Sequence, residues 1–246
     1  VTKGLDPDVA MKDSGVEWLG AIPKHWGITR LRYVSELIVD CPHETPSYDP
    51  EGDYFVIRTA DIENGVLDPK SMYRLNEHEY YHRVRREPVL NEDIVYGREG
   101  ERWGHAAIVP ESGRYALGQR MMQIRLAKNM SSSFLMWILN SGNVYRQGET
   151  DIVGATSPHV NISTITNYTL AYPPQREQEK IAQFLDETTG GYDSLIAQAE
   201  DTTNLLYERR SALISAAVTG KIDVRDWEPP VSETFPQSTV NEEAPA

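Results

Sequence analysis

The chain has 246 residues, of which 39% are hydrophobic and 9% aromatic, enough to bury one sizeable core with an appended element. No stretch approaches the roughly 18 apolar residues that a membrane span requires, and the first residues lack the basic-then-apolar order of a signal peptide. The single Cys41 excludes an internal disulfide and any multi-cysteine zinc site. We therefore expect a globular, cytoplasmic protein with no membrane partner.

The net charge of −13 at first argues against nucleic-acid binding, because proteins that neutralise phosphates usually have a basic balance. The distribution of charge modifies this view. Between residues 70 and 128, eleven basic side chains stand against eight acidic ones. A locally basic face on an acidic chain suits a DNA contact inside a larger complex, in which a partner makes most of the phosphate contacts. The charge alone favours a solvated surface of mixed sign equally well.

The chain up to residue 174 has the pattern of a β-rich domain. Short β-branched and aromatic runs predict strands at 54–57, 93–96, 106–109 and 121–126. Glycine and proline punctuate these runs, which is typical of an antiparallel or mixed, curled sheet. The apolar run 134–139 predicts a short buried helix that the preceding serines can cap.

A long helix is predicted after Pro173 and Pro174, because proline ends the β-pattern. From Ile181 onward a seam residue recurs alternately every four and three positions over about five heptads, which is typical of a coiled coil. The apolar seam residues, which form the predicted dimerisation surface, are Ile181, Leu185, Tyr192, Leu195, Ala199, Leu206 and Leu213.

The seam is imperfect, because Thr188, Thr202 and Arg209 occupy apolar positions. Gly190 and Gly191 interrupt it, which predicts a kinked or two-piece helix. The domain offers no second long helix, so we expect the seam to pair with a second copy of the chain. A helix folded back on its own domain is the alternative.

Six segments of the chain form a recognisable series. They are 11–26 (MKDSGVEWLGAIPKHW), 93–109 (DIVYGREGERWGHAAIV), 118–126 (GQRMMQIRL), 154–174 (GATSPHVNISTITNYTLAYPP), 175–198 (QREQEKIAQFLDETTGGYDSLIAQ) and 209–227 (RRSALISAAVTGKIDVRDW). Together they resemble the specificity subunits of Type I restriction-modification systems. The resemblance is to a half-length form, because the chain has one target recognition domain and one conserved helix where members of usual length have two of each.

The resemblance implies an α/β (α+β) fold, in which one β-rich target recognition domain is followed by a long coiled-coil-forming helix. The implied domains are an amino-terminal segment at 1–29, the DNA-binding recognition domain at 30–174, a dimerisation and docking helix at 175–222 and a disordered acidic tail at 223–246.

The resemblance further implies a subunit without catalysis or cofactor that homodimerises on double-stranded DNA and reads a bipartite palindromic site. It would direct adenine-N6 methyltransferase subunits and restriction subunits. A regulatory or orphan half-subunit that competes with a full-length one in mixed assemblies is a further interpretation.

One motif points to a different class of protein. His78, Glu79 and His82 form an H-E-x-x-H sequence, whose helical spacing can place two histidines on one zinc ion with the glutamate as general base. The surrounding residues are charged rather than apolar, and no third ligand follows at short spacing. A zinc-dependent hydrolase is therefore the alternative to a recognition subunit.

The expected DNA contacts lie on two segments, because arginine suits guanine edges and phosphates. The loop between the strands predicted at 93–96 and 106–109 carries Arg98, Arg102, Trp103 and His105. A second cluster that can follow the DNA backbone contains Tyr81, Arg83, Arg85 and Arg86. For a third group, structural hydrogen bonding is the expected role; it consists of Ser157, His159 and Asn161.

Overall fold

The computed structural model describes residues 3–152 and 158–228, so the predicted tail lies outside the described residues from residue 229 onward. The chain divides into two compact units, Val1–Thr189 and Gly190–Ala246. No helix among the described residues has both the length and the apolar character needed to cross a bilayer.

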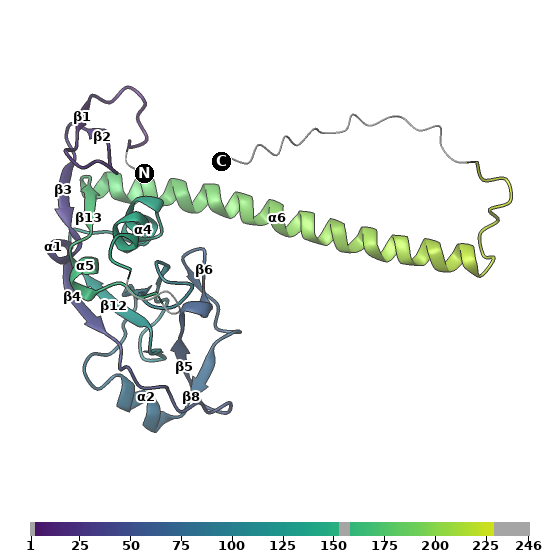
Figure 1. Ribbon diagram of the computed structural model, residues 1–246, viewed down its shortest axis with the longest axis horizontal. Helices are drawn as coiled ribbons and strands as arrows, with labels where there is room; N and C mark the ends of the chain where they lie inside the picture. The colour runs from purple at the N-terminus through teal and green to yellow at the C-terminus, as the bar shows by residue number, and fades with distance from the viewer. Residues whose placement is uncertain (1–2, 153–157, 229–246) are drawn as a thin grey trace, which may run out of the picture. The chain divides into compact units, whose positions relative to one another are not determined.

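The first unit holds the strands and the shorter helices. The strands are β1 (Met11–Asp13), β2 (Ala21–Pro23), β3 (Gly27–Arg30), β4 (Ser35–Asp40), β5 (Tyr54–Ile57), β6 (Ile62–Glu63), β7 (Val66–Leu67), β8 (Tyr73–Leu75), β9 (Ile94–Gly97), β10 (Ala106–Ile108), β11 (Tyr115–Leu117), β12 (Met121–Leu126) and β13 (Thr169–Tyr172). Its shorter helices are α1 (Leu31–Val34), the 3-10 turn η1 (Thr59–Asp61), α2 (Glu77–Arg83), α3 (Ser132–Leu139), α4 (Gly142–Glu149) and α5 (Ile162–Thr166), and α6 (Gln175–Val218) begins in this unit and continues into the second. The predicted α/β class is confirmed, since a β-rich unit precedes a long helix in the chain (Figure 1).

An antiparallel sheet of order β10-β9-β12-β4 forms the centre of the first unit. β9 is buried over its whole length, because its side chains alternate between two apolar cores. Ile94 and Tyr96 enter the larger core, whereas Val95 enters the smaller one. A strand buried on both faces is a continuous apolar run in the sequence. The strands predicted at 93–96 and 121–126 are therefore found, as β9 and β12.

A three-stranded sheet of order β11-β5-β8 lines the smaller core. β11 runs parallel to β5 and β8 runs antiparallel to it, so this sheet is mixed. The strand predicted at 54–57 is its central member. In Figure 1, β5 and β8 lie beside α2, whereas β3, β13 and the start of α6 lie at the other end of the unit.

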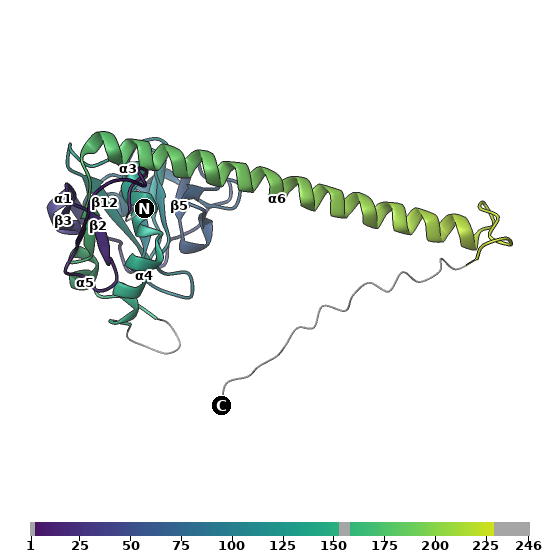
Figure 2. The ribbon, with the colours of Figure 1, turned by 90° about the horizontal axis from the view of Figure 1, so that it is seen from above.

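α3 and the first turns of α6 lie side by side over the larger core (Figure 2). Ser131 caps α3 as predicted, since its hydroxyl accepts the Phe134 N–H at 3.3 Å. The buried Gln178 of α6 accepts the Ser131 N–H at 2.9 Å and donates to the Pro173 carbonyl at 2.9 Å. Ile181 is 1% exposed in the same core. This seam residue therefore serves the core of the first unit.

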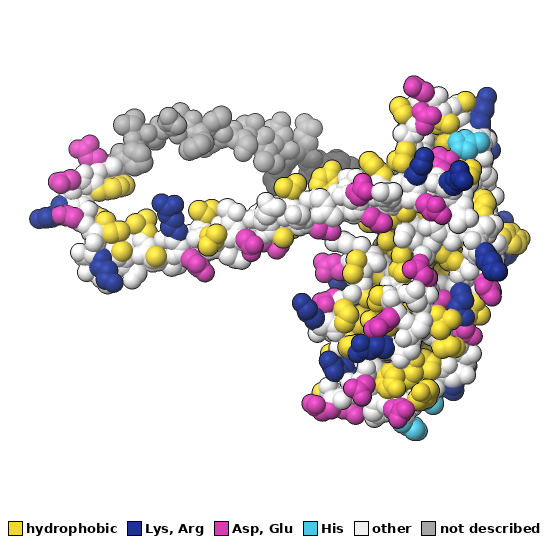
Figure 3. Space-filling model, turned by 180° about the vertical axis from the view of Figure 1, so that it is seen from behind, with side chains coloured by type: hydrophobic (Ala, Val, Ile, Leu, Met, Phe, Trp, Pro, Cys, Tyr) yellow, Lys and Arg dark blue, Asp and Glu magenta, His cyan; other side chains and the backbone are white. Residues whose placement is uncertain are grey.

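α6 continues as a single helix through Gly190 and Gly191, so the predicted two-piece helix is not found. A glycine costs about 1 kcal/mol relative to alanine in a helix, but it keeps the backbone donor that proline lacks. In the second unit several seam residues are exposed, namely Tyr192 (61%), Leu195 (62%), Leu206 (60%) and Leu213 (57%). Figure 3 shows hydrophobic side chains along this part of α6, between acidic and basic ones.

Candidate nucleic-acid interface

One end of the central sheet brings together loops from distant parts of the sequence. Because neighbouring strands are antiparallel, the carboxyl ends of β4 and β9 meet the amino ends of β10 and β12 there. The loops that leave or enter this end are 40–43, 98–105 and 118–120, and we call the surface they form the sheet-end face. The first of the two predicted DNA-contacting segments is thus part of a composite surface.

The β9–β10 loop at 98–105 is fixed by backbone hydrogen bonds to two other segments. The Arg98 N–H donates to the Arg120 carbonyl at 3.1 Å, and the Gly100 N–H donates to the Pro158 carbonyl at 2.9 Å. These bonds satisfy backbone groups that a loop usually leaves to water. The loop therefore presents its side chains from a held backbone.

Trp103 anchors this loop from the inside. Its side chain is buried, and its ring stacks on that of Tyr145 in α4 with the centroids 4.2 Å apart. Gly104 follows with φ +86°, and a Cβ there would lie 2.9 Å from the Tyr145 ring, so this turn requires glycine. Trp103 was expected to contact DNA, but its burial gives it a packing role.

Arg98 is also buried, at 7% exposure. Its Nε and Nη2 lie 2.9 and 3.2 Å from the two carboxylate oxygens of Asp40, and Nη2 lies 2.7 Å from Glu99. Two carboxylates thus balance its charge. Arg98 joins the end of β4 to the β9–β10 loop, and its guanidinium is occupied before any ligand arrives.

The exposed basic side chains of the sheet-end face are His43, Arg102, His105 and Arg120, and the acidic Glu101 is exposed there as well. Arg102 donates from Nη2 to the Ile62 carbonyl at 2.7 Å, which orients it without neutralising it. Within the described ranges, no ion pair involves Arg102 or Arg120. Partial desolvation, and then the charge of Arg102, lower the pKa of the His105 imidazole below its usual value. The face therefore carries two guanidinium groups without an ion-pair partner among the described residues, beside an imidazole whose pKa is lowered.

The second predicted segment begins with a buried residue. The guanidinium of Arg83 donates to the carbonyls of Leu117, Glu44 and Pro42 at 2.8, 3.1 and 3.1 Å. Desolvation on burial lowers the pKa of Arg83. Arg83 is thus a structural residue that attaches the end of α2 to segments next to the sheet-end face.

The remaining members of this second cluster are at the surface. Tyr81 is 58% exposed, and Arg85 and Arg86 are exposed as well. Arg85 donates to the His82 carbonyl at 2.7 Å. These three side chains therefore lie at the surface of the helix that Arg83 attaches to Pro42 and Leu117.

The H-E-x-x-H motif lies on α2, and two of its side chains, Glu79 and His82, contact neighbouring arginines. The Glu79 carboxylate lies 3.6 Å from Nη1 of Arg83, and the His82 ring lies 3.0 Å from Nη1 of Arg85. In the part of the chain that the structure describes, no three His, Cys, Asp or Glu side chains are grouped to hold a metal ion. The geometry does not favour the zinc hydrolase.

The third predicted group sits beside the β9–β10 loop. His159 forms an isolated backbone bridge with Glu99. The Asn161 amide donates to the Asp151 carboxylate at 3.1 and 3.0 Å, so it has the structural role that was expected. Ser157 lies outside the described residues.

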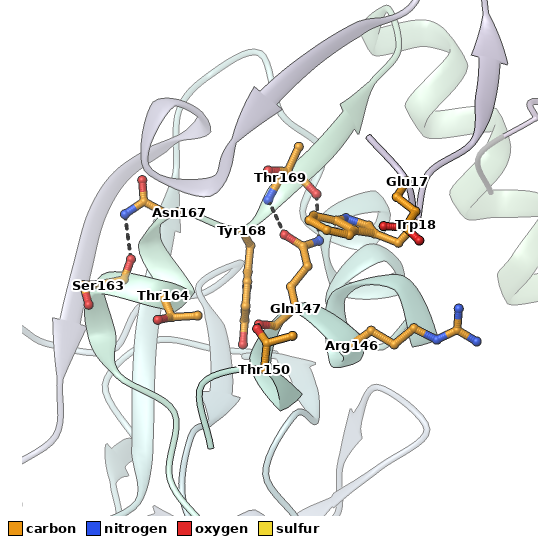
Figure 4. A pocket seen from close by; sticks show the side chains of 10 residues that line it. All are labelled: Glu17, Trp18, Arg146, Gln147, Thr150, Ser163, Thr164, Asn167, Tyr168 and Thr169. Carbon is orange, nitrogen blue, oxygen red and sulfur yellow. Dashed lines mark hydrogen bonds between the residues drawn. The ribbon is translucent and has the colours of Figure 1, made fainter. Parts of the chain in front are cut away.

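An open hollow of about 850 Å³ lies away from this face, between the amino-terminal segment, α4 and α5. Figure 4 shows that the Gln147 amide is turned towards the Thr169 backbone, to which it makes two hydrogen bonds of 3.0 and 2.7 Å. The Asn167 amide likewise donates to the Ser163 carbonyl at 2.7 Å. Both amides are therefore engaged with the backbone of the lining.

Two residues of the sheet-end face, Gln119 and Arg120, were missed by the sequence interpretation. They form the turn between β11 and β12 with Gly118. The available signal was the glycine between two apolar runs, which predicts a turn but not its neighbours.

A family model described as the Type I restriction modification DNA specificity domain matches residues 23–201. The chain belongs to this family. The specificity subunit of the Type I restriction enzyme EcoKI from Escherichia coli (strain K12) is 26% identical over 229 residues, which cover 85% of the chain and 46% of the relative. The specificity subunit of EcoDI from Escherichia coli is 28% identical over 124 residues, which cover 50% of the chain and 27% of the relative.

Solved structures agree on the fold. The HsdS subunit from Thermoanaerobacter tengcongensis superposes with a TM-score of 0.56 at 16% identity, over 86% of the chain and 48% of that subunit. The chain thus spans about half the length, or less, of the specificity subunits it matches. The family resemblance seen in the sequence is confirmed, because the matching model is described as a DNA specificity domain and the matched relatives are named as specificity subunits.

Proposed function

We propose that the chain is the DNA sequence-recognition part of a Type I restriction-modification complex and that the sheet-end face contacts the DNA. One observation carries the proposal: Arg102 and Arg120 are exposed on a held loop and turn and lack a carboxylate partner among the described residues. A DNA duplex supplies the missing partners, as anionic phosphates and as hydrogen-bond acceptors on the base edges. His105 is the neutral donor or acceptor beside them.

The exposed part of the α2 cluster extends this contact. Arg85 and Arg86 neutralise phosphates, and Tyr81 donates a hydrogen bond or packs against a sugar. Arg83, Arg98 and Trp103 support the surface from inside and do not touch the DNA. In this proposal the buried residues of the two predicted segments support the surface, and the exposed ones contact the DNA.

The exposed seam of α6 pairs with the same seam of a second copy of the chain in this proposal. Tyr192, Leu195, Leu206 and Leu213 provide the apolar residues, and Ala199 permits close approach of the helices. Two copies related by twofold symmetry would read a bipartite palindromic site. The pair would direct methyltransferase subunits, which modify adenine at N6, and restriction subunits to that site.

The proposal is tested with the full chain, alone and with its methyltransferase subunit. Light scattering coupled to size exclusion should give two copies of the chain, and two copies of each subunit in the complex. Titration with labelled duplexes should show one sequence bound far more tightly than random DNA. Equal binding of all duplexes would refute the recognition role, and a strict monomer in both samples would refute the pairing.

A further inference from the structure

A small hollow opens beside the β9–β10 loop, on the sheet-end face. Its volume is about 330 Å³, and its lining consists of Tyr48, Arg58, Thr59, Ala60, Gly118, Gln119 and Arg120. The lining contains two arginines and an amide but no carboxylate. Its chemistry therefore suits a partner with hydrogen-bond acceptors and partial negative charge.

Arg58 forms a fixed wall of this hollow. Its Nε and Nη2 donate to the Asp61 carboxylate at 3.0 and 2.6 Å, and Nη2 also donates to the Ser71 carbonyl at 3.0 Å. The guanidinium lies 3.7 Å from the centroid of the Tyr73 ring. A side chain held by three partners has little freedom to follow a ligand, so the adaptable groups are elsewhere.

Gln119 has an unused amide at this site. Its Oε1 is buried and has no hydrogen-bond partner among the described residues. A buried acceptor without a partner is unfavourable, and the terminal torsion of glutamine is broad, so the amide can turn towards a donor in the hollow at small cost. A ligand that enters the hollow with a hydrogen-bond donor would therefore satisfy the Gln119 Oε1.

Arg120 is adjacent to Gln119 and is exposed. Its carbonyl accepts the Arg98 N–H at 3.1 Å, which holds the backbone of the turn. Its Nη1 lies 2.8 Å from the place that a Cβ of Gly100 would take, so the glycine leaves room for the guanidinium. Arg120 thus has a fixed backbone and a guanidinium without an ion-pair partner among the described residues. This guanidinium is available to a planar ligand.

We propose that Gln119 and Arg120 read base edges in the major groove, and that the bases are purines. This rests on the proposed function. In the major groove only adenine N6 and cytosine N4 donate hydrogen bonds, and a glutamine amide matches the N6 and N7 of adenine with both its atoms. The guanidinium of Arg120 matches the O6 and N7 of guanine in the same way. The β11–β12 turn is thus a determinant of sequence preference.

The test is selection from a randomised duplex library by the full chain with its methyltransferase subunit, followed by sequencing of the bound DNA. The wild type should select a sequence with adenine and guanine in each half-site. Arg120→Ala should lose the preference for one guanine by about ten-fold or more. Gln119→Glu should change one preferred adenine to cytosine, because a carboxylate only accepts.

Matched controls separate reading from general binding. Arg114 lies at the opposite end of β11 and is exposed and paired with Glu111, so Arg114→Ala should select the wild-type sequence. Thermal unfolding of each variant identifies any that fail to fold, and the exchange of adenine for cytosine requires a folded protein.

The outcomes distinguish the two proposals. A wild type that selects no sequence refutes the recognition function and this inference with it. A wild type that selects a sequence, together with folded Gln119→Glu and Arg120→Ala variants that select the same sequence equally strictly, refutes the inference alone.

Discussion

The guanidinium of Arg98 meets the carboxylate of Asp40 at two points, with Nε 2.9 Å from Oδ1 and Nη2 3.2 Å from Oδ2. The pair connects the end of β4 to the β9–β10 loop, and Arg98 is 7% exposed. Glu99 adds a second carboxylate at 2.7 Å. The loop that carries Arg102 and His105 is therefore held by a buried charge network.

Replacing Arg98 by alanine should lower the free energy of unfolding. Any loss of DNA affinity should be indirect, because Arg98 does not touch the DNA in the proposed contact. Removal of one member of a buried pair leaves the other charge uncompensated, which costs about 3 kcal/mol. Glu99 would lose its partner, and Asp40 would keep only its contact with His43. Urea unfolding measures this loss, and we expect the midpoint to fall with little change in slope.

Arg102→Ala is the matched control, since Arg102 is exposed and makes one hydrogen bond, to Ile62. It should change stability by less than about 1 kcal/mol and reduce DNA binding. If both variants unfolded at the same urea concentration as the wild type, the structural role of Arg98 would be wrong.

The sequence identified the loop but could not separate its structural residues from its exposed ones. Arg98 and Arg102 are the same residue type four positions apart, and the difference between them is Asp40, 58 residues away from Arg98 in the chain. Trp103 likewise needed Tyr145 to reveal its packing role. Local patterns predict strands such as β5 and β12 well because burial is periodic. Partners that are distant in sequence decide which charges remain free.

The helix shows the same limit. Its 3.5-residue repeat predicts one seam from Ile181 to Leu213, yet Ile181 is buried in the core of the first unit and Leu206 is exposed in the second. A heptad repeat predicts which side chains share a face of the helix. It does not predict which part of that face packs against the core of the same chain. The short strands β8 and β11 were not predicted, although β10, which also has three residues, was predicted at 106–109.

Replacing both Arg85 and Arg86 by alanine should weaken binding to all DNA sequences alike. Each neutralises a phosphate in the proposed contact and releases counterions, so the slope of log K against log salt should fall in magnitude by about 2. The selected sequence should stay that of the wild type. Titrations at several salt concentrations measure the slope, and an unchanged slope would place these arginines off the DNA.

His105 should make stability depend on pH in the acid range. Its pKa in the folded chain is lowered by partial desolvation and by Arg102, whereas in the unfolded chain it stays at the ordinary 6.5. Between these two values the unfolded chain binds the proton more readily, so stability falls as the pH drops below about 6.5. His105→Gln should remove this part of the loss.

Melting temperatures of the wild type and His105→Gln between about pH 5 and pH 8 measure the difference. The two curves should run in parallel at high pH and diverge as the pH falls, with the variant relatively more stable. Curves that stay parallel throughout would show that the imidazole is not desolvated.

Leu205 and Leu206 offer a matched pair for testing the α6 seam. Both are leucines in the same turn, with exposures of 65% and 60%, but only Leu206 belongs to the predicted seam. A charge at a seam position must be buried on pairing and is costly there, whereas a charge off the seam stays in water. Leu206→Asp should therefore yield monomers, and Leu205→Asp should remain paired.

Light scattering at one protein concentration compares the two variants, and circular dichroism checks that α6 remains helical in each. The monomeric variant should also lose affinity for a duplex with two half-sites while keeping its affinity for one with a single half-site, because pairing supplies the gain from simultaneous contact. If both variants stayed dimeric, pairing would lie on another surface. If both became monomeric, the interface would extend over the face that carries Leu205, and the helices would pack more broadly than a two-stranded seam.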